Sequence, residues 1–283
     1  MKYLIVSADD FGCSKSINRG IIRAFKDGIV TSIHLMSAAS EFEDALAQAS
    51  QAGIKEMGAH LCLSSAIPVT NPDNIPTLVA GNGRFYEGYH RIALGYFFKK
   101  NNLKEIRLEL KNQLGRIKKS GIKITSLSSH EHVHMLPDIL SIFVELAKEY
   151  KIPAIRYPRK DKLSWPITIN KLKKIFASAC FEKKMGVVLR KSGLAYTDNF
   201  LGLLDSGNLK EETLIRLLGS LGQGYTELVT HPGFLSPEAI RESPFYLNCE
   251  KELAVLTGDR VKKLVSDLNI KLVTFEEFCS CPR

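Results

Sequence analysis

Short apolar runs alternate along this chain with longer stretches whose apolar residues recur at helical spacing. Runs of strand length lie at 3–7, 32–36, 56–62, 122–128, 154–157, 227–230 and 271–274. Helix-period stretches lie between them, at 17–26, 42–52, 103–119, 140–148, 214–221 and 249–268. Repeated strand–helix units imply a parallel sheet, and about seven of them in one chain favour a barrel over an open sheet.

No internal repeat or low-complexity linker interrupts the pattern, so we predict one α/β domain over residues 1–283. With 45% hydrophobic and 24% charged residues, the chain can bury one large core or two smaller ones. One segment departs from the alternation, since residues 64–88 are rich in Pro, Asn, Gly and Thr. Long loops in compact domains are usually functional, and we predict a substrate-binding rim here.

The chain is basic, with 39 Lys and Arg against 30 Asp and Glu and a formal charge of +9. Basic residues interleave with apolar ones between 171 and 191. This pattern favours a surface helix with a solvated basic face, and contact with an anionic membrane is the alternative. No zinc-finger, helix-turn-helix or aromatic-rich RNA-binding signature accompanies it, so we expect no nucleic-acid partner. Nothing in the pattern sets the oligomeric state.

The sequence carries no signal for export or for membrane insertion. No apolar run reaches the ~18 residues of a membrane span. The apolar start of the chain is shorter than the ~7–15 residues of a signal-peptide core. The six cysteines are scattered without a Cys-x-x-Cys pair, which favours reduced thiols. We therefore expect a cytoplasmic protein.

Residues 128–137 read Ser-Ser-His-Glu-His-Val-His-Met-Leu-Pro, an unusual concentration of imidazoles. His130, His132 and His134 would share one face if the preceding strand continued through them. Imidazole is a common ligand for divalent metals and a proton carrier near neutral pH. For His132 and His134 we favour contact with substrate or with the metal ligands over direct ligation. A structural zinc site made by all three histidines is the alternative.

Other chemically active residues follow the predicted strands, at the carboxyl ends where parallel α/β folds assemble active sites. They are Asp9 and Asp10 after the first run, His60 near the end of the third, His130 after the fourth, Arg156 and Arg159 at the fifth, and His231 after a late one. Each alone is ordinary, because an aspartate after a strand is most often a helix cap. Their common position at one end of the predicted sheet indicates a site.

Adjacent aspartates have a chemical use at a strand end, because both carboxylates can reach one site from different directions. One can bind a cation while the other accepts a proton from water whose pKa the cation lowers. Two histidines and one carboxylate form a ligand set that leaves positions open for water and substrate. Asp10, His60 and His130 supply such a set.

Four motifs occur in the order typical of the YdjC-like carbohydrate deacetylases. They are Ala-Asp-Asp-Phe-Gly at 8–12, Gly-x-His-Leu-x-Leu at 58–63, Ser-His-x-His-Val-His-Met-Leu-Pro at 129–137 and Thr-His-Pro-Gly-Phe at 230–234. Weaker matches follow at 155–159 and 197–202. Over nearly its whole length the chain resembles this family, which includes chitooligosaccharide deacetylases and deacetylases associated with hopanoid biosynthesis. The resemblance implies an α/β fold, a distorted TIM-like (β/α) barrel with about seven βα units.

The resemblance also implies a chemistry. One divalent metal ion, Mg or Zn, would be held by Asp10, His60 and His130, with Asp9 as the catalytic base. His231 would be the general acid that protonates the leaving amine. The implied activity is removal of an acetyl group from an N-acetylated sugar, either an oligosaccharide or a lipid-linked glycan, by metal-activated water. Arg156 would orient Asp9 or hold the sugar, and we place Arg159 with the substrate contacts.

The chain departs from the family pattern just before His130. Members usually carry Thr-His-x-Asp-Ser-His, whereas this chain has Ser126 and Ser128 in place of the histidine and aspartate. If that aspartate orients the metal site, its loss weakens metal binding about 10–100-fold. Two alternatives therefore stand beside the deacetylase: a sugar- or lipid-binding pseudoenzyme, and another metal-dependent hydrolase such as a phosphoesterase. We interpret Cys62 as a buried structural thiol.

Overall fold

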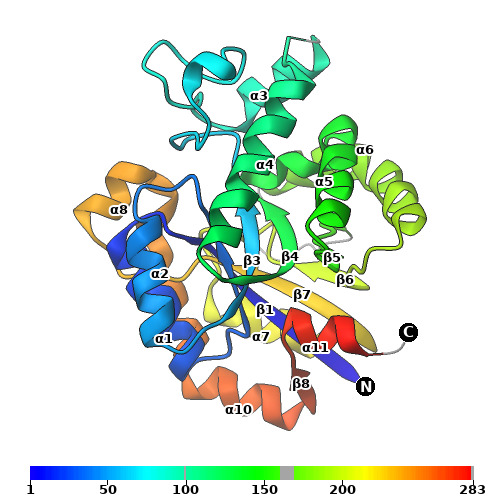
Figure 1. The fold of residues 1–283 in the computed structure, drawn as a ribbon. Coiled ribbons are helices and arrows are strands. Elements are labelled where there is room, and N and C mark those ends of the chain that lie inside the picture. Colours follow the sequence, from blue (N-terminus) through cyan, green and yellow to red (C-terminus); the bar gives the residue numbers. More distant parts are fainter. Residues whose placement is uncertain (99, 160–168, 282–283) are drawn as a thin grey trace.

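A curled sheet of parallel strands forms the centre of the molecule (Figure 1). This computed structural model describes residues 1–98, 100–159 and 169–281, with the backbone alone at 169–180. The strands are β1 (Lys2–Phe11), β2 (Ser32–Leu35), β3 (Glu56–Leu61), β4 (Lys123–Ser129), β5 (Ala154–Ile155), β6 (Asn199–Leu201), β7 (Gly224–Thr230) and β8 (Ile270–Leu272). Their spatial order is β5-β4-β3-β2-β1-β7-β6, and β8 pairs with β1.

β1 is the central strand, because three others pair with it. β7 pairs with Lys2 to Ala8 along one edge. Along the other edge, β8 pairs with the amino-terminal half of β1 and β2 with the carboxyl-terminal half. The strand is buried from Leu4 onward, as its apolar sequence predicts. This arrangement carries Asp9 and Asp10 into the middle of the sheet at its carboxyl edge.

Helices cover the sheet and connect its strands. They are α1 (Lys15–Asp27), α2 (Phe42–Gln51), α3 (Tyr89–Phe97), α4 (Leu103–Lys119), α5 (Pro137–Glu149), α6 (Ile169–Ser192), α7 (Glu211–Gly219), α8 (Pro237–Glu242), α9 (Cys249–Thr257), α10 (Asp259–Asp267) and α11 (Phe275–Ser280). Short 3₁₀ segments occur at η1 (Pro72–Asn74), η2 (His130–Met135) and η3 (Pro244–Asn248). α4 shows why these segments are helical, since its buried residues Ile106, Leu110 and Leu114 recur every fourth position.

The prediction of an α/β fold with a curled parallel sheet is confirmed. Ala154 of β5 forms a parallel bridge with Ala195, which precedes β6, and the curled sheet is a half-barrel. Several local features differ from the predictions, and the helices α3, α8 and α11 were not expected. The short strand β6 was missed, and the helix expected over 249–268 is two helices, because Gly258 adopts an extended conformation between them.

The segment 64–88 lies beyond the carboxyl ends of β3 and β4, above their arrowheads in Figure 1. It is anchored, since Ile75 and Phe85 are buried. The backbone N–H groups of Val69 and Thr70 donate to the carboxylate of Glu109 on α4, at 2.9 and 2.8 Å. The buried side chains of the segment therefore join the main hydrophobic core at the edge of the sheet where active sites form.

The predicted basic helix corresponds to α6. Lys171, Lys173 and Lys174 lie outside the described side chains. In the described part, Lys183 and Lys184 are exposed, whereas Met185 and Leu189 are buried. That part of α6 is thus an amphipathic surface helix. No helix in the described part of the chain is long and apolar enough to cross a membrane.

Candidate metal centre

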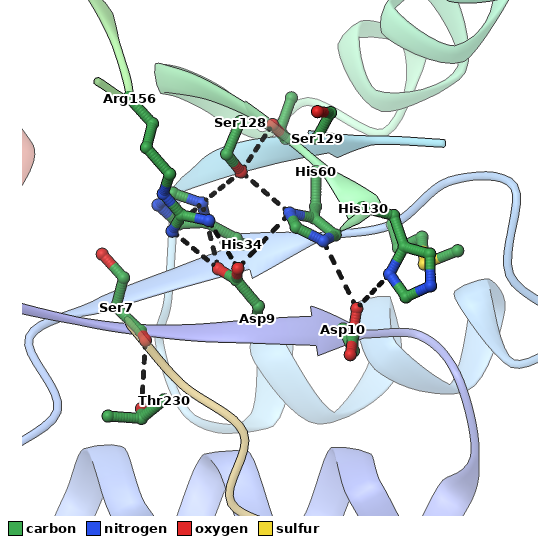
Figure 2. A network of polar contacts seen from close by, with 12 residues as sticks. Ser7, Asp9, Asp10, His34, His60, Ser128, Ser129, His130, Arg156 and Thr230 are labelled. Carbon is green, nitrogen blue, oxygen red and sulfur yellow. Dashed lines mark hydrogen bonds and ion pairs between the residues drawn. The ribbon is translucent and has the colours of Figure 1, made fainter. Parts of the chain in front are cut away.

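Both carboxylates at the end of β1 approach one histidine (Figure 2). Oδ2 of Asp9 lies 3.7 Å from Nδ1 of His60, and Oδ1 of Asp10 lies 3.3 Å from Nε2 of the same ring. Consecutive strand residues ordinarily point to opposite faces. Here a register irregularity between Ala8 and Phe11, with φ of +66° at Asp10, redirects the side chains. Both carboxylates therefore border one site.

Asp10, His60 and His130 come together at the ends of β1, β3 and β4. Oδ1 of Asp10 lies 3.0 Å from Nδ1 of His130, and the three ligand atoms are all within 4.8 Å of one another. The Tyr246 hydroxyl donates to the other oxygen of Asp10 at 2.9 Å and orients that carboxylate. Two imidazoles and one carboxylate, with His130 still 20% exposed, fit a divalent cation with open coordination positions.

A second group of ligand atoms, from Asp9, His34 and His60, suits a cation poorly. The fully buried guanidinium of Arg156 already donates to both oxygens of Asp9, with Nη2 at 2.8 Å from Oδ1. Its Nε donates to Glu227 at 2.9 Å, and Ser7 donates to the same Glu227 oxygen at 2.8 Å. A cation here would be repelled by Arg156, so the geometry favours the first group as the metal site.

The charges around the site set its protonation. Burial opposes ionisation of Asp9, but the Arg156 guanidinium outweighs it and lowers the carboxyl pKa far below its usual range. Burial likewise opposes ionisation of Asp10, and His130 reverses the balance, so that the pKa of Asp10 is also low. Burial disfavours the His130 cation, yet the charge of Asp10 raises its pKa to about 9. A divalent cation bound here would displace the His130 proton.

The histidine-rich segment does not continue β4, so the expectation of a shared strand face was wrong. β4 ends at Ser129, and Glu131 and His132 adopt left-handed conformations with φ of 53° and 54° in the turn η2. His134 is buried, with Nδ1 2.5 Å from the Ser129 hydroxyl and Nε2 3.2 Å from the Arg156 carbonyl oxygen. His134 therefore holds the turn against β5.

His132 has different surroundings. Its ring packs edge-on against Phe200 at 5.9 Å, and its buried Nδ1 has no hydrogen-bond partner among the described residues. Neither group of ligand atoms found in the described part of the chain includes His132 or His134. The alternative of a zinc site made by all three histidines is therefore not formed.

His231 follows β7 and lies near the same carboxylates. Its backbone N–H donates to Glu252 at 2.7 Å, and its ring packs edge-on against Phe245 at 4.8 Å. Burial lowers the pKa of His231, while the negative charges of Asp10 and Asp9 oppose that shift. Its buried Nδ1 has no partner among the described residues.

Arg159 is directed away from the site. Its guanidinium donates to the backbone carbonyl oxygen of Asp198, at 2.7 Å from Nε, and stacks over the ring of Tyr157. Cys62 is fully buried, and its thiol faces the carbonyl oxygen of Ser64 at 2.7 Å, so its interpretation as a buried thiol is confirmed.

The sequence reasoning missed His34, Glu227 and Tyr246. His34 lies in β2 and is fully buried, with Nδ1 2.7 Å from the Ser128 hydroxyl and 3.2 Å from Nη2 of Arg156. The signal for it was present, because a histidine inside a short apolar strand needs polar partners in the core. Burial raises the pKa of Glu227 despite its contact with Arg156.

These features define a class of protein: a curled parallel α/β fold with an Asp-His-His centre at its carboxyl edge. The chain belongs to the YdjC-like family, whose model, YdjC-like protein, matches residues 3–267. The predicted family is thus confirmed.

Relatives of known name are similar over nearly their whole length. A carbohydrate deacetylase of Brevibacillus brevis is 33% identical over 282 residues, which cover 97% of this chain and 98% of that protein. A chitooligosaccharide deacetylase of Yersinia pestis is 28% identical over 279 residues, which cover 97% of this chain and 98% of that protein. Among solved structures, a protein of Enterococcus faecalis V583, for which cellobiose-phosphate cleavage has been proposed, superposes with a TM-score of 0.80 at 26% identity and covers 98% of both chains.

Proposed function

We propose that this protein is a metal-dependent carbohydrate N-deacetylase, an amide hydrolase that releases acetate from an N-acetylated sugar. One observation carries the proposal: Asp10, His60 and His130 converge as a ligand set beside a second, ionised carboxylate, Asp9. The names of the related carbohydrate deacetylases support the substrate class. Mg or Zn both suit a site of two imidazoles and one carboxylate with open positions.

The residues around the ligand set have distinct proposed roles. Asp10, His60 and His130 would hold a divalent cation, which would supply Lewis acidity to an amide carbonyl and to water. Asp9 accepts the proton of the attacking water. Its ion pair with Arg156 makes it a weak base, which suffices for water of lowered pKa. His231 protonates the leaving nitrogen, a step that is required because an amine anion is a very poor leaving group.

The finer substrate assignment is an oligosaccharide or a lipid-linked glycan. The related chitooligosaccharide deacetylases support an oligosaccharide. We propose the segment 64–88 as the rim that contacts the sugar, because it stands over the carboxyl ends of β3 and β4 (Figure 1). His132 and the exposed part of His130 are the further candidates for substrate contact.

The roles can be tested with paired measurements of bound metal and acetate release from N-acetylated sugars and glycolipids. Asp9→Asn should lose turnover and keep the metal, whereas His130→Ala should lose the metal itself. If Asp9→Asn empties the site and Asp10→Asn does not, the two aspartates are reversed. Metal binding without acetate from any sugar would favour the sugar- or lipid-binding pseudoenzyme. Release of phosphate from a phosphorylated sugar instead would favour the phosphoesterase.

A lipid-linked substrate would bring the protein to a membrane, and we propose contact with an anionic bilayer through the end of α3. Phe97 and Phe98 are 61% and 69% exposed, and the Phe97 ring lies 6.3 Å from Phe181 of α6. The exposed Lys183 and Lys184 follow Phe181 on that helix, so apolar and cationic groups occur together.

The vesicle test uses the double variant Lys183→Gln/Lys184→Gln. Binding to phosphatidylglycerol vesicles should weaken by about 1 kcal/mol for each lysine, with no binding to neutral phosphatidylcholine. Unchanged binding to the anionic vesicles would reject the surface.

A further inference from the structure

The metal-facing side of His60 depends on a hydrogen bond on its other side. An imidazole that binds a cation through Nε2 carries its proton on Nδ1, and that N–H needs an acceptor, most often a carboxylate or a backbone carbonyl. In this chain Nε2 of His60 faces Asp10, and Nδ1 lies 2.8 Å from the hydroxyl oxygen of Ser128 (Figure 2). A serine therefore stands where a carboxylate is usual.

A hydroxyl can donate as well as accept, so Ser128 alone leaves the tautomer of His60 undetermined. The second partner of Ser128 removes this ambiguity. Its oxygen also lies 2.7 Å from Nδ1 of His34, and the same Nδ1 lies 3.2 Å from Nη2 of Arg156. A guanidinium nitrogen can only donate, so a hydrogen bond from Arg156 requires Nδ1 of His34 to accept and places the His34 proton on Nε2; Oδ1 of Asp9, 3.4 Å from the same Nδ1, is the competing acceptor for a proton there. That Nε2 faces the hydroxyl of Ser126 at 3.4 Å.

The directions of the remaining hydrogen bonds follow. Because Nδ1 of His34 accepts, the Ser128 hydroxyl donates to it and turns its lone pairs toward His60. Nδ1–H of His60 then donates to Ser128, and the lone pair of Nε2 is directed to the site. The chain of donors runs from His60 through Ser128 to His34, and every buried polar atom in it has a partner.

The neighbouring backbone leaves space for the imidazole ring of His34. His34 is fully buried, and a Cβ at position 58 would lie 2.5 Å from its Cδ2, so the glycine at 58 leaves the room that the ring occupies. The relay is also neutral. A carboxylate at position 128 would add another buried negative charge to a region that already contains Asp9, Asp10 and Glu227.

We propose that His34 is a positioning residue of the metal site: by accepting the Ser128 hydrogen bond it sets the tautomer and orientation of His60. It replaces a carboxylate with a serine–histidine pair. The inference rests on the metal site proposed above. The proposal also gives a role to Ser128. From the sequence alone, the serine at this position predicts weaker metal binding.

The test compares two variants whose side chains have the same number and branching of heavy atoms. Asn at position 34 keeps an oxygen acceptor close to the place of Nδ1, whereas Leu has the same branching without an acceptor. Zn²⁺ affinity of the full chain is measured by competition with a chromogenic chelator at neutral pH. We expect His34→Asn to bind within about threefold of the parent and His34→Leu to bind about 10–100-fold more weakly. Ser128→Ala should lose as much as His34→Leu, and the double variant no more than either.

The tautomer itself provides a readout that packing alone does not produce. Long-range ¹H–¹⁵N spectra of the Zn²⁺-loaded, histidine-labelled protein should show His60 protonated on Nδ1 and His34 on Nε2. Ser128→Ala gives this comparison even if His34→Leu fails to fold, because it removes only one oxygen atom.

Equal Zn²⁺ affinity of the Asn and Leu variants, or an unchanged Ser128→Ala protein, would overturn the relay. A proton on Nδ1 of His34 would do the same. Failure of the parent protein to bind Zn²⁺, Mn²⁺ or Mg²⁺ is a different result, which would overturn the metal site and with it the proposed function.

Discussion

Replacing Arg156 by Met tests the central claim about the core of the site, that a single buried cation holds two carboxylates. Arg156 and Glu227 are both fully buried and Asp9 is 2% exposed, so water cannot take over the lost hydrogen bonds. Removing one partner of a buried ion pair costs about 3–5 kcal/mol. Because two carboxylates lose their partner here, we expect a loss near the upper end, about 5 kcal/mol at pH 7.5.

The pH dependence separates charge from packing. In the parent, Arg156 holds the pKa of Asp9 low, so the ion pair stabilises the fold above the unfolded-state pKa of about 4. In the variant, burial without a counter-charge raises the pKa of both carboxyls. A carboxyl group whose pKa is raised in the folded protein lowers the free energy of unfolding at pH values above its unfolded-state pKa. This penalty becomes smaller as the pH falls toward the unfolded-state pKa. The difference between parent and variant should therefore be smaller at pH 5 than at pH 7.5.

The assay is urea unfolding followed by circular dichroism at both pH values, with a chelator present so that metal binding makes no contribution. Arg156→Lys is the matched control, since it keeps the charge without the planar fork, and it should lose less than Arg156→Met. A loss below about 1 kcal/mol, or a larger loss that is the same at both pH values, would refute the reasoning.

Three smaller predictions follow from buried groups, each measured by the same unfolding assay. Burial raises the pKa of Glu252 to about 7 from an ordinary 4.5, so the parent loses stability as pH rises through this window. Glu252→Gln should match the parent near pH 4.5 and exceed it by up to about 3 kcal/mol at pH 8, and the opposite trend would contradict the assignment. Gly58→Ala should cost about 1–3 kcal/mol, because its Cβ would lie 2.7 Å from the Ser126 hydroxyl; a neutral result would mean that this region is loosely packed. Ser14→Ala should cost about 1 kcal/mol, since the Ser14 hydroxyl caps α1 by accepting an N–H at 3.2 Å; no change would assign the cap to water.

The strand pattern predicted much of the site because parallel strands end at a common edge. The run expected at 3–7 is the centre of β1, observed at Lys2–Phe11, and the run at 56–62 is β3. Once those strands were assigned, the carboxyl-edge rule brought Asp10, His60 and His130 into one neighbourhood without any knowledge of packing.

The boundaries of secondary-structure elements were predicted wrongly where the backbone turns without a change in the polar and apolar pattern of the sequence. If the strand had continued through the three histidines they would share one face, but Glu131 and His132 turn the chain with positive φ. Periodicity also joined α9 to α10, because one glycine between two apolar helices hardly disturbs a 3.6-residue repeat.

By itself the sequence determined the parallel α/β class, the family and the approximate position of the proposed metal ligands, since all three depend on short-range spacing and on ordered motifs. Only the tertiary structure decided how those ligands are held. The contact of Arg156 with Asp9 joins residues 147 apart, and that of His34 with Ser128 joins residues 94 apart. Partners so far apart in the sequence leave no periodic pattern in it, because their contact depends on which strands lie side by side in the curled sheet. The sequence alone therefore suggested a defect at position 128, whereas in the folded protein the Ser128 hydroxyl contacts both His34 and His60.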